Sequence, residues 1–267
     1  MILLGDIGGT NMRLARAQEP LSPVHIKTPQ TYEEGLSQII RTAREISGSE
    51  PIESIIAGVP GVLSLEKDRL LRAPHLTQWV DRLLVRDLNE ALGATVILEN
   101  DAALVGLGEA HYGAGRKSAI MVYITISTGV NGARIVEGRI DRSINGFEVG
   151  SQYLSHGDTL ETFEGLVSGT AIHKKYGVSP KELGLDHPVW EELARTVAIG
   201  VHNTILEWSP DTIVLGGSMF NTIGINVSRV RDHLKDIMHA FPDIPHVFHA
   251  ELGDDGGLYG GLVLSGH

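Results

Sequence analysis

The feature that most constrains this chain is an apolar strand that breaks into glycines and then resumes. Residues 2–7 are mainly apolar, Gly8–Thr10 interrupt them, and an alternating segment follows over residues 12–17. This pattern predicts a hairpin of two strands with a glycine tip. Residues 119–139, AIMVYITISTGVNGARIVEGR, repeat the order of strand, glycine turn and strand. The repetition predicts two lobes of related architecture.

The length and the other patterns agree with an α/β protein of two lobes. Its 267 residues exceed the size that one hydrophobic core usually serves. Thr31 and Glu34 predict a capping box at the start of a helix. The polar break Gly113–Ser118 predicts lobes at 1–115 and 116–253. Apolar spacing predicts further helices over 83–92, 102–112, 160–176 and 189–208, and strands over 52–59, 95–98 and 211–215.

Composition excludes several classes of function. The 33 acidic residues against 22 Lys and Arg give a formal charge of −11, which disfavours nucleic acid and anionic membranes as partners. The chain has no cysteine, so disulfides, thiol nucleophiles and thiolate metal sites are excluded. The apolar run at Ala119–Tyr123 is far shorter than the ~18 residues of a membrane span. With no basic residue before Asp6, we expect no secretory signal and a cytoplasmic protein.

Three glycine turns, each following a predicted strand, are candidate phosphate sites. A single glycine turn needs no ligand, because a tight hairpin requires positive φ, which glycine adopts easily. Three such turns favour a shared role, since adjacent glycines expose backbone N–H groups and a following Thr adds a hydroxyl. Asp6 precedes the first turn and is a candidate to hold Mg²⁺ through water. The candidate turn residues are Gly8, Gly9, Thr10, Thr128, Gly129, Gly216 and Gly217.

The ordered motifs resemble those of the ROK sugar kinases, which belong to the hexokinase, Hsp70 and actin superfamily. DIGGTN (Asp6–Asn11), STGVNG (Ser127–Gly132) and VLGGSM (Val214–Met219) are similar to the ATP-binding set of that family. The likeness spans nearly the whole chain. It implies two actin-like ATPase (RNase H-like) lobes with a nucleotide and sugar cleft between them, and a closing helix at 254–267 that packs on the first lobe. Further motifs in family order are GVPG, LENDAALVGLGEAHYGAG, NGFEVG, FEGLVSGTAI and LGDDGGLYGG.

The resemblance implies an ATP- and Mg²⁺-dependent hexose kinase, similar to a glucokinase, acting on the 6-hydroxyl. Asp101 would be the general base, and Asn100 would bind the sugar. Glu148 and Glu164 would accept sugar hydroxyls, and Gly61 would let the backbone approach the sugar. The competing interpretations are local: Asn100 or Asp101 caps the helix that begins near Ala102, and each glutamate is a solvated surface acid.

The chain also departs from the resembled family. Ser151 stands where a histidine is common, and the cysteine loop is absent, so no structural zinc is expected. His75 replaces an asparagine before Trp79. These changes leave open which hexose is used. Two alternatives remain: a sugar-binding sensor without turnover, and a kinase that uses polyphosphate. Related repressors carry an N-terminal DNA-binding segment, and we expect none here because the phosphate motif already starts at Asp6. The resemblance also favours a homodimer.

Overall fold

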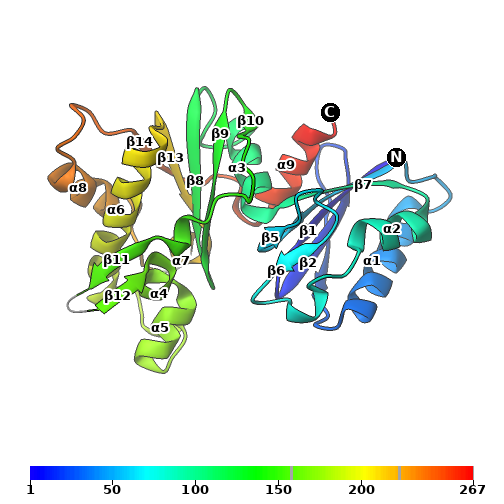
Figure 1. The fold of residues 1–267 in the computed structure, drawn as a ribbon, viewed down its shortest axis with the longest axis horizontal. Helices are drawn as coiled ribbons and strands as arrows, with labels where there is room; N and C mark the ends of the chain where they lie inside the picture. The colour runs from blue at the N-terminus through cyan, green and yellow to red at the C-terminus, as the bar shows by residue number, and fades with distance from the viewer. Residues whose placement is uncertain (157–158, 222–223, 267) are drawn as a thin grey trace. The chain divides into compact units, whose positions relative to one another are not determined.

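The computed structural model describes residues 1–156, 159–221 and 224–266. Its chain forms two five-stranded sheets (Figure 1). The first has the order β3-β2-β1-β4-β7, in which β1 to β3 are antiparallel and β4 and β7 run parallel to β1. Its strands are β1 (Ile2–Ile7), β2 (Asn11–Arg16), β3 (Val24–Lys27), β4 (Ser54–Val59) and β7 (Thr95–Asn100).

The second sheet has the same topology in the order β10-β9-β8-β13-β14. Here β8 to β10 are antiparallel, while β13 and β14 run parallel to β8. The repetition predicted from residues 1–17 and 119–139 is therefore confirmed. The strands are β8 (Ile120–Ile126), β9 (Val130–Val136), β10 (Arg139–Ile140), β13 (Thr212–Gly216) and β14 (His246–His249).

Contacts divide the chain into two compact units. Unit 1 holds Met1–Gly108, Arg142–Gly146 and Asp254–His267, and unit 2 holds Glu109–Asp141 and Phe147–Gly253. The first division falls within α3 (Asp101–His111), before the Gly113–Ser118 break that the sequence favours. No helix in the described part of the chain has the length and hydropathy needed to cross a membrane.

Helices cover both faces of the unit 1 sheet (Figure 1). The helices α1 (Tyr32–Ser47) and α2 (Leu84–Leu92) pack over β2 and β7, and their apolar side chains join one core. On the other face, α9 (Gly256–Leu264) contacts β1 and β4. A Cβ at Gly261 of α9 would lie 3.2 Å from Leu4 Cδ2, so the small residues of α9 allow close packing on the sheet.

The predicted capping box at α1 is wrong. Thr31 occupies the N-cap position, but its side chain makes no capping bond to the backbone. Its hydroxyl instead donates to Glu34 Oε2 at 2.8 Å, so the two side chains satisfy each other. The helix is held mainly by the burial of Tyr32, Ile39 and Ala43 in the unit 1 core.

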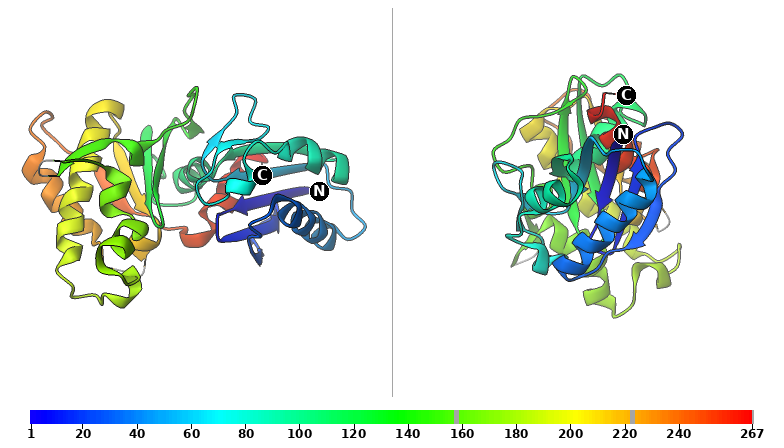
Figure 2. Two further views of the ribbon diagram at one scale, coloured as in Figure 1. Left: turned by 60° about the horizontal axis from the view of Figure 1, so that its bottom comes forward. Right: turned by 90° about the vertical axis from the view of Figure 1, so that its right-hand side faces the viewer.

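In unit 2, α6 (Val189–Trp208) and α8 (Val227–Ile237) pack side by side, as Figure 1 and the left view of Figure 2 show in yellow and orange. The helix predicted over 160–176 is only partly correct. Residues 159–162 form the strand β12, and two helices, α4 (Phe163–Val167) and α5 (Gly169–Tyr176), follow it. Ser168 separates them because its backbone is extended and its side chain accepts a hydrogen bond from Ala171 N, which starts α5.

Several short elements complete the two units. The short strands are β5 (Val62–Leu63), β6 (Leu70–Arg72), β11 (Tyr153–His156) and β12 (Thr159–Thr162), and the remaining α-helix is α7 (Ser218–Asn221). The 3-10 turns are η1 (Thr77–Trp79), η2 (Val149–Ser151), η3 (Pro180–Glu182) and η4 (Gly253–Asp255).

A buried carboxylate in α3 organises the start of unit 2. Glu109 is fully buried, and its two oxygens accept hydrogen bonds from the backbone. Oε2 accepts from Ala114 N at 2.8 Å, and Oε1 accepts from Leu252 N at 2.9 Å. Gly113 leaves the space for this carboxylate, since a Cβ there would lie 2.0 Å from Oε2. Glu109 therefore joins two segments that are far apart in the sequence.

We expect Glu109→Ala to lower the free energy of unfolding by about 2 kcal/mol or more, because two backbone N–H groups lose their acceptor. Urea unfolding measures the change. Glu109→Gln keeps one acceptor oxygen, so its free energy of unfolding is expected to fall less than that of Glu109→Ala. Equal stability of the wild type and Glu109→Ala would contradict this role.

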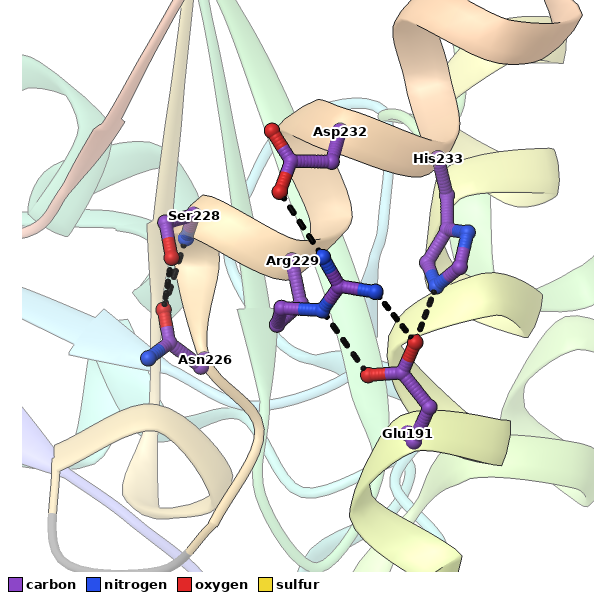
Figure 3. Close-up of polar contacts among 6 residues, drawn as sticks. All are labelled: Glu191, Asn226, Ser228, Arg229, Asp232 and His233. Atoms are coloured by element: carbon purple, nitrogen blue, oxygen red, sulfur yellow. Dashed lines mark hydrogen bonds and ion pairs between the residues drawn. The ribbon is translucent and has the colours of Figure 1, made fainter.

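A charged network joins α6 to α8 (Figure 3). Arg229 donates to Glu191 through Nε at 3.0 Å and through Nη2 at 2.6 Å. His233 Nε2 lies 2.8 Å from Glu191 Oε1, and Arg229 also pairs with Asp232. The hydrogen bond from Arg229 is the main cause that lowers the pKa of Glu191 to about 2, while desolvation opposes it.

This lowered pKa gives a signed pH dependence. A carboxylate with a depressed folded pKa adds stability above its unfolded pKa, and that stability is lost as the pH falls toward the folded value. We therefore expect the urea midpoint of the wild type to fall more between pH 5 and pH 3 than that of Glu191→Gln. The carboxylate is about half exposed, so high salt should shrink the difference. Glu207→Gln on the same helix is the control and should behave like the wild type.

Candidate active site

The parallel strands of unit 1 bring its candidate residues to one edge of the sheet. In β1, β4 and β7 the register pairs Asp6 with Gly58, and Val59 with Asn100. The three strands therefore end side by side, and their ends lead into the Gly8–Thr10 turn, Gly61 and Asp101. Ligands of open α/β sheets commonly bind at this carboxyl edge.

Neighbouring atoms lie so close to the first turn that they leave no room for a Cβ at residues 8 and 9. Neither Gly8 nor Gly9 has positive φ, so the simple hairpin explanation does not apply to them. A Cβ at Gly8 would lie 2.8 Å from Asn11 O, and one at Gly9 would lie 2.6 Å from His75 Cβ. The turn is supported from behind: Thr28 Oγ1 donates to Gly8 O at 2.7 Å, and Gln30 Nε2 donates to Gly9 O at 3.0 Å.

Asp6 is paired with an arginine that the sequence reasoning missed. Arg13 Nη1 donates to Asp6 Oδ2 at 3.0 Å, and both side chains are only 15% exposed. Arg13 Nη2 also lies 3.1 Å from Asp254 Oδ2. Burial raises the pKa of Asp6, and the charge of Arg13 opposes that rise. In the hairpin Arg13 lies directly opposite Asp6, so the register of the predicted hairpin could have indicated this ion pair.

The single carboxylate of Asp6 is compatible with a Mg²⁺ site. This ion usually keeps several waters and uses one or two protein carboxylates together with substrate phosphates. Asp6 supplies one such group at the carboxyl edge of β1. Among residues 1–156, 159–221 and 224–266, no group of three or more His, Asp or Glu side chains is placed to hold a metal ion.

Asn100 and Asp101 begin α3 beside Gly61. Asn100 Nδ2 donates to Gly61 O at 3.1 Å, and Asn100 Oδ1 accepts from Ala103 N at 3.1 Å. The helix-cap interpretation is therefore confirmed for Asn100, and it leaves the expected sugar role untested. Asp101 Oδ1 accepts from Ala102 N at 2.8 Å, which orients the carboxylate.

Two features of the structure each require glycine at position 61. Its φ is +87°, which L side chains rarely adopt. A Cβ there would also lie 2.0 Å from Arg72 O. Gly61 thus holds the 72–73 backbone close to the end of β4.

Unit 2 places its two glycine turns next to each other. The turn Thr128–Gly129 follows β8. Gly216 ends the adjacent parallel strand β13, where it pairs with Thr125, and Gly217 follows it. Gly217 has φ of +92°, and a Cβ there would lie 2.4 Å from Ile126 O. The start of α5 supports the first turn, since Thr170 Oγ1 donates to Thr128 O at 2.7 Å. This support from Thr170 was not predicted.

The two segments that carry the candidate sugar-binding glutamates of unit 2 both contact Val130, the first residue of β9. Glu164 is exposed at the start of α4, yet its Oε2 accepts from Val130 N at 2.8 Å. Glu148 immediately precedes η2, and Gly150 of η2 packs on Val130 so closely that a Cβ would lie 2.2 Å from Val130 O. Glu164 is therefore an exposed acid, as the surface interpretation expects, and it also has a backbone partner, while its expected role in sugar binding stays a prediction.

The two positions that depart from the resembled family lie in different units. Ser151 is exposed and ends η2 in unit 2. His75 is exposed in unit 1 and contacts the glycine turn at Gly9. Trp79 fixes the segment that carries His75, because its buried ring donates from Nε1 to Pro29 O at 3.2 Å.

Two sheets with this shared topology define an α/β protein of the actin-like ATPase fold. The chain belongs to the ROK family, whose model matches residues 5–266. It is 27% identical, over an alignment 305 positions long, to a glucokinase of Thermotoga maritima, covering 97% of this chain and 95% of that protein. It is 25% identical to a fructokinase of Pediococcus pentosaceus, covering 70% and 69%. The crystal structure of a ROK hexokinase from Thermus thermophilus matches with a TM-score of 0.83 at 27% identity, covering 98% and 96%.

We expect Gly61→Ala to destabilise the protein more than Gly93→Ala. Both glycines have positive φ, but a Cβ at Gly93 meets open space whereas one at Gly61 meets Arg72 O. Gly93→Ala should therefore cost only the backbone strain, roughly 1 kcal/mol. Urea unfolding of both variants compares the two costs. Equal losses of unfolding free energy in the two variants would mean that the 72–73 backbone moves away from the new Cβ at position 61 without cost.

Proposed function

We propose that this protein is an ATP-dependent hexose kinase with Asp101 as its general base. The observation that carries the proposal is the carboxyl edge of the unit 1 sheet. There the Gly8–Thr10 turn and the carboxylate of Asp6 stand at the end of β1, and the Asn100–Asp101 pair stands at the end of β7, with the parallel strand β4 between them. The relatives named glucokinase, fructokinase and hexokinase support sugar phosphorylation.

The proposed reaction follows from the chemistry of phosphoryl transfer. A sugar hydroxyl must be aligned with the terminal phosphate, and a nearby group must accept its proton. Asp101 is suited to this step because it is partly buried at the start of α3 and its Oδ1 is fixed by Ala102 N. We assign it the proton of the 6-hydroxyl.

Sugar binding is assigned to Asn100, Gly61, Glu148 and Glu164. A carboxylate that accepts two hydroxyls orients a pyranose better than a single neutral contact. Glu164 is pre-oriented for such a role, since the bond from Val130 N holds one of its oxygens. Glu148 precedes η2, whose Gly150 packs on Val130, so the two glutamates are carried by segments that contact the same residue.

Phosphate binding is assigned to the glycine turns of both units. Backbone N–H groups at these turns match phosphate oxygens, and Thr10 and Thr128 add hydroxyls. Asp6 would hold Mg²⁺ through water, and this ion neutralises charge on the phosphates when it is bound. The phosphate-binding residues are Gly8, Gly9, Thr10, Asn11, Thr128, Gly129, Gly216 and Gly217.

A panel of hexoses tests the function directly. Purified protein with ATP and Mg²⁺ is mixed with glucose, mannose, fructose and N-acetylmannosamine in turn, and ADP release is followed. We expect release that depends on at least one sugar, with glucose the first candidate. If calorimetry detects sugar binding but no sugar stimulates ADP release, the protein is a sensor and the kinase proposal fails. Repeating the panel with polyphosphate identifies the donor.

We expect Asp101→Asn to lower kcat at least about 100-fold, because the amide cannot accept the proton. The dissociation constant of the sugar, measured by calorimetry, should change only a few-fold. Asp186→Asn at an exposed position is the control and should keep full activity. An Asp101→Asn variant with wild-type kcat would exclude Asp101 as the base.

A further inference from the structure

The β5–β6 hairpin of unit 1 is bonded to the end of β7 at two points. At its base, Asn100 Nδ2 donates to Gly61 O at 3.1 Å, and Gly61 directly precedes β5. At its tip, the ammonium of Lys67 forms an ion pair and a hydrogen bond with Glu99 Oε2. The strands β5 and β7 are also in contact between these points. The hairpin is therefore joined to the strand end that leads into Asp101.

Glu99 connects the tip of the hairpin to the backbone of the next residue. Its Oε2 accepts from Lys67, and its Oε1 accepts from Asn100 N at 2.9 Å. The side chain of Glu99 is only 13% exposed, so little water competes for these bonds. Asn100 is the last residue of β7, and Asp101 is the first residue of α3. The carboxylate of Glu99 thus holds the point where the strand becomes the helix.

Lys67 has a backbone conformation that favours glycine. Its φ is +52°, in the left-handed region that a lysine adopts much less often than glycine or asparagine. Side chains close the turn around it, since Ser64 Oγ donates to Asp68 Oδ1 at 2.6 Å and accepts from Asp68 N at 3.0 Å. Lys67 N also donates to Ser64 O at 2.9 Å. A lysine at such a position costs free energy, which indicates that its side chain has a role that glycine could not fill.

We propose that Lys67 and Glu99 are positioning residues for Asp101. The Lys67–Glu99 pair fixes the backbone at the junction of β7 and α3, and the direction of the Asp101 carboxylate depends on that backbone. The side chain of Asn100 depends on the pair less, because Gly61 O holds it separately. Loss of the pair should therefore affect proton transfer more than sugar binding. This inference rests on the proposed role of Asp101 as the general base.

Lys67→Asn removes the ammonium without straining the turn, because asparagine adopts positive φ more readily than lysine. We expect kcat for sugar-dependent ADP release to fall up to about fivefold, as for a partly exposed ion pair, and the KM for sugar to change less than about twofold. Lys67→Arg should retain most of the wild-type kcat. Glu99→Ala also removes the acceptor of Asn100 N, so kcat should fall about tenfold. Arg16→Met, which breaks a partly exposed ion pair at the amino end of β1, is the control and should keep full activity.

Amide hydrogen exchange of Asn100, followed by NMR, separates failure of this inference from failure of the kinase proposal. Lys67→Asn and Glu99→Ala should each exchange this amide several-fold faster than the wild type. Thermal unfolding of Lys67→Asn should stay close to that of the wild type, because relief of the strained φ offsets the lost ion pair.

Unchanged exchange in both variants, or wild-type kcat in both, would overturn the positioning role even if the wild type proves to be a kinase. If the wild type releases no ADP with any sugar, the kinase proposal fails, and the exchange of Asn100 alone then decides whether the Lys67–Glu99 pair holds this backbone. A large loss of thermal stability in Lys67→Asn together with wild-type kcat would show that the pair serves folding only.

Discussion

Parallel pairing of the central strands decides where each unit can carry chemistry. Hydrogen-bond register fixes the ends of β1, β4 and β7 at one edge, and it does the same for β8 and β13. Residues that follow these strands must therefore gather, although they lie far apart in the sequence. A glycine turn after one strand and a carboxylate after another become neighbours without any direct contact between them. The duplicated topology repeats this arrangement in each unit.

Close approach of the backbone accounts for many of the glycines before any ligand is considered. Gly8, Gly9 and Gly61 each have a neighbour where a Cβ would stand, and so do Gly150 and Gly217. Glycine at these positions is therefore required by packing, and its presence alone is weak support for phosphate binding. The support comes from their placement, because the Gly8–Gly9 and Gly216–Gly217 turns stand at strand ends where ligands of such sheets bind.

Local patterns predicted the central strands β1, β4, β7, β8 and β13, the repeated hairpin and the helix beginning near Ala102, because each depends on residues close in sequence. The contacts that they missed join residues distant in sequence. Glu164 bonds to Val130, and Gly9 packs on His75. The failed capping box at Thr31 shows a second limit: Thr31 and Glu34 stand at the right spacing, yet their side chains bond to each other. Spacing along the sequence indicates which side chains can reach each other, and the packing of the folded chain decides which of these contacts form.

The ion pair between Asp6 and Arg13 constrains how a metal can use Asp6. Arg13 occupies Oδ2 and lies between Asp6 and Asp254, so its positive charge already offsets part of the cost of burying Asp6. A divalent ion in direct contact with this carboxylate would have to compete with the guanidinium. Coordination through water avoids that competition, because it keeps the ion farther from Arg13 and leaves the bond to Oδ2 intact. The buried pair therefore favours the water-mediated arrangement over direct ligation.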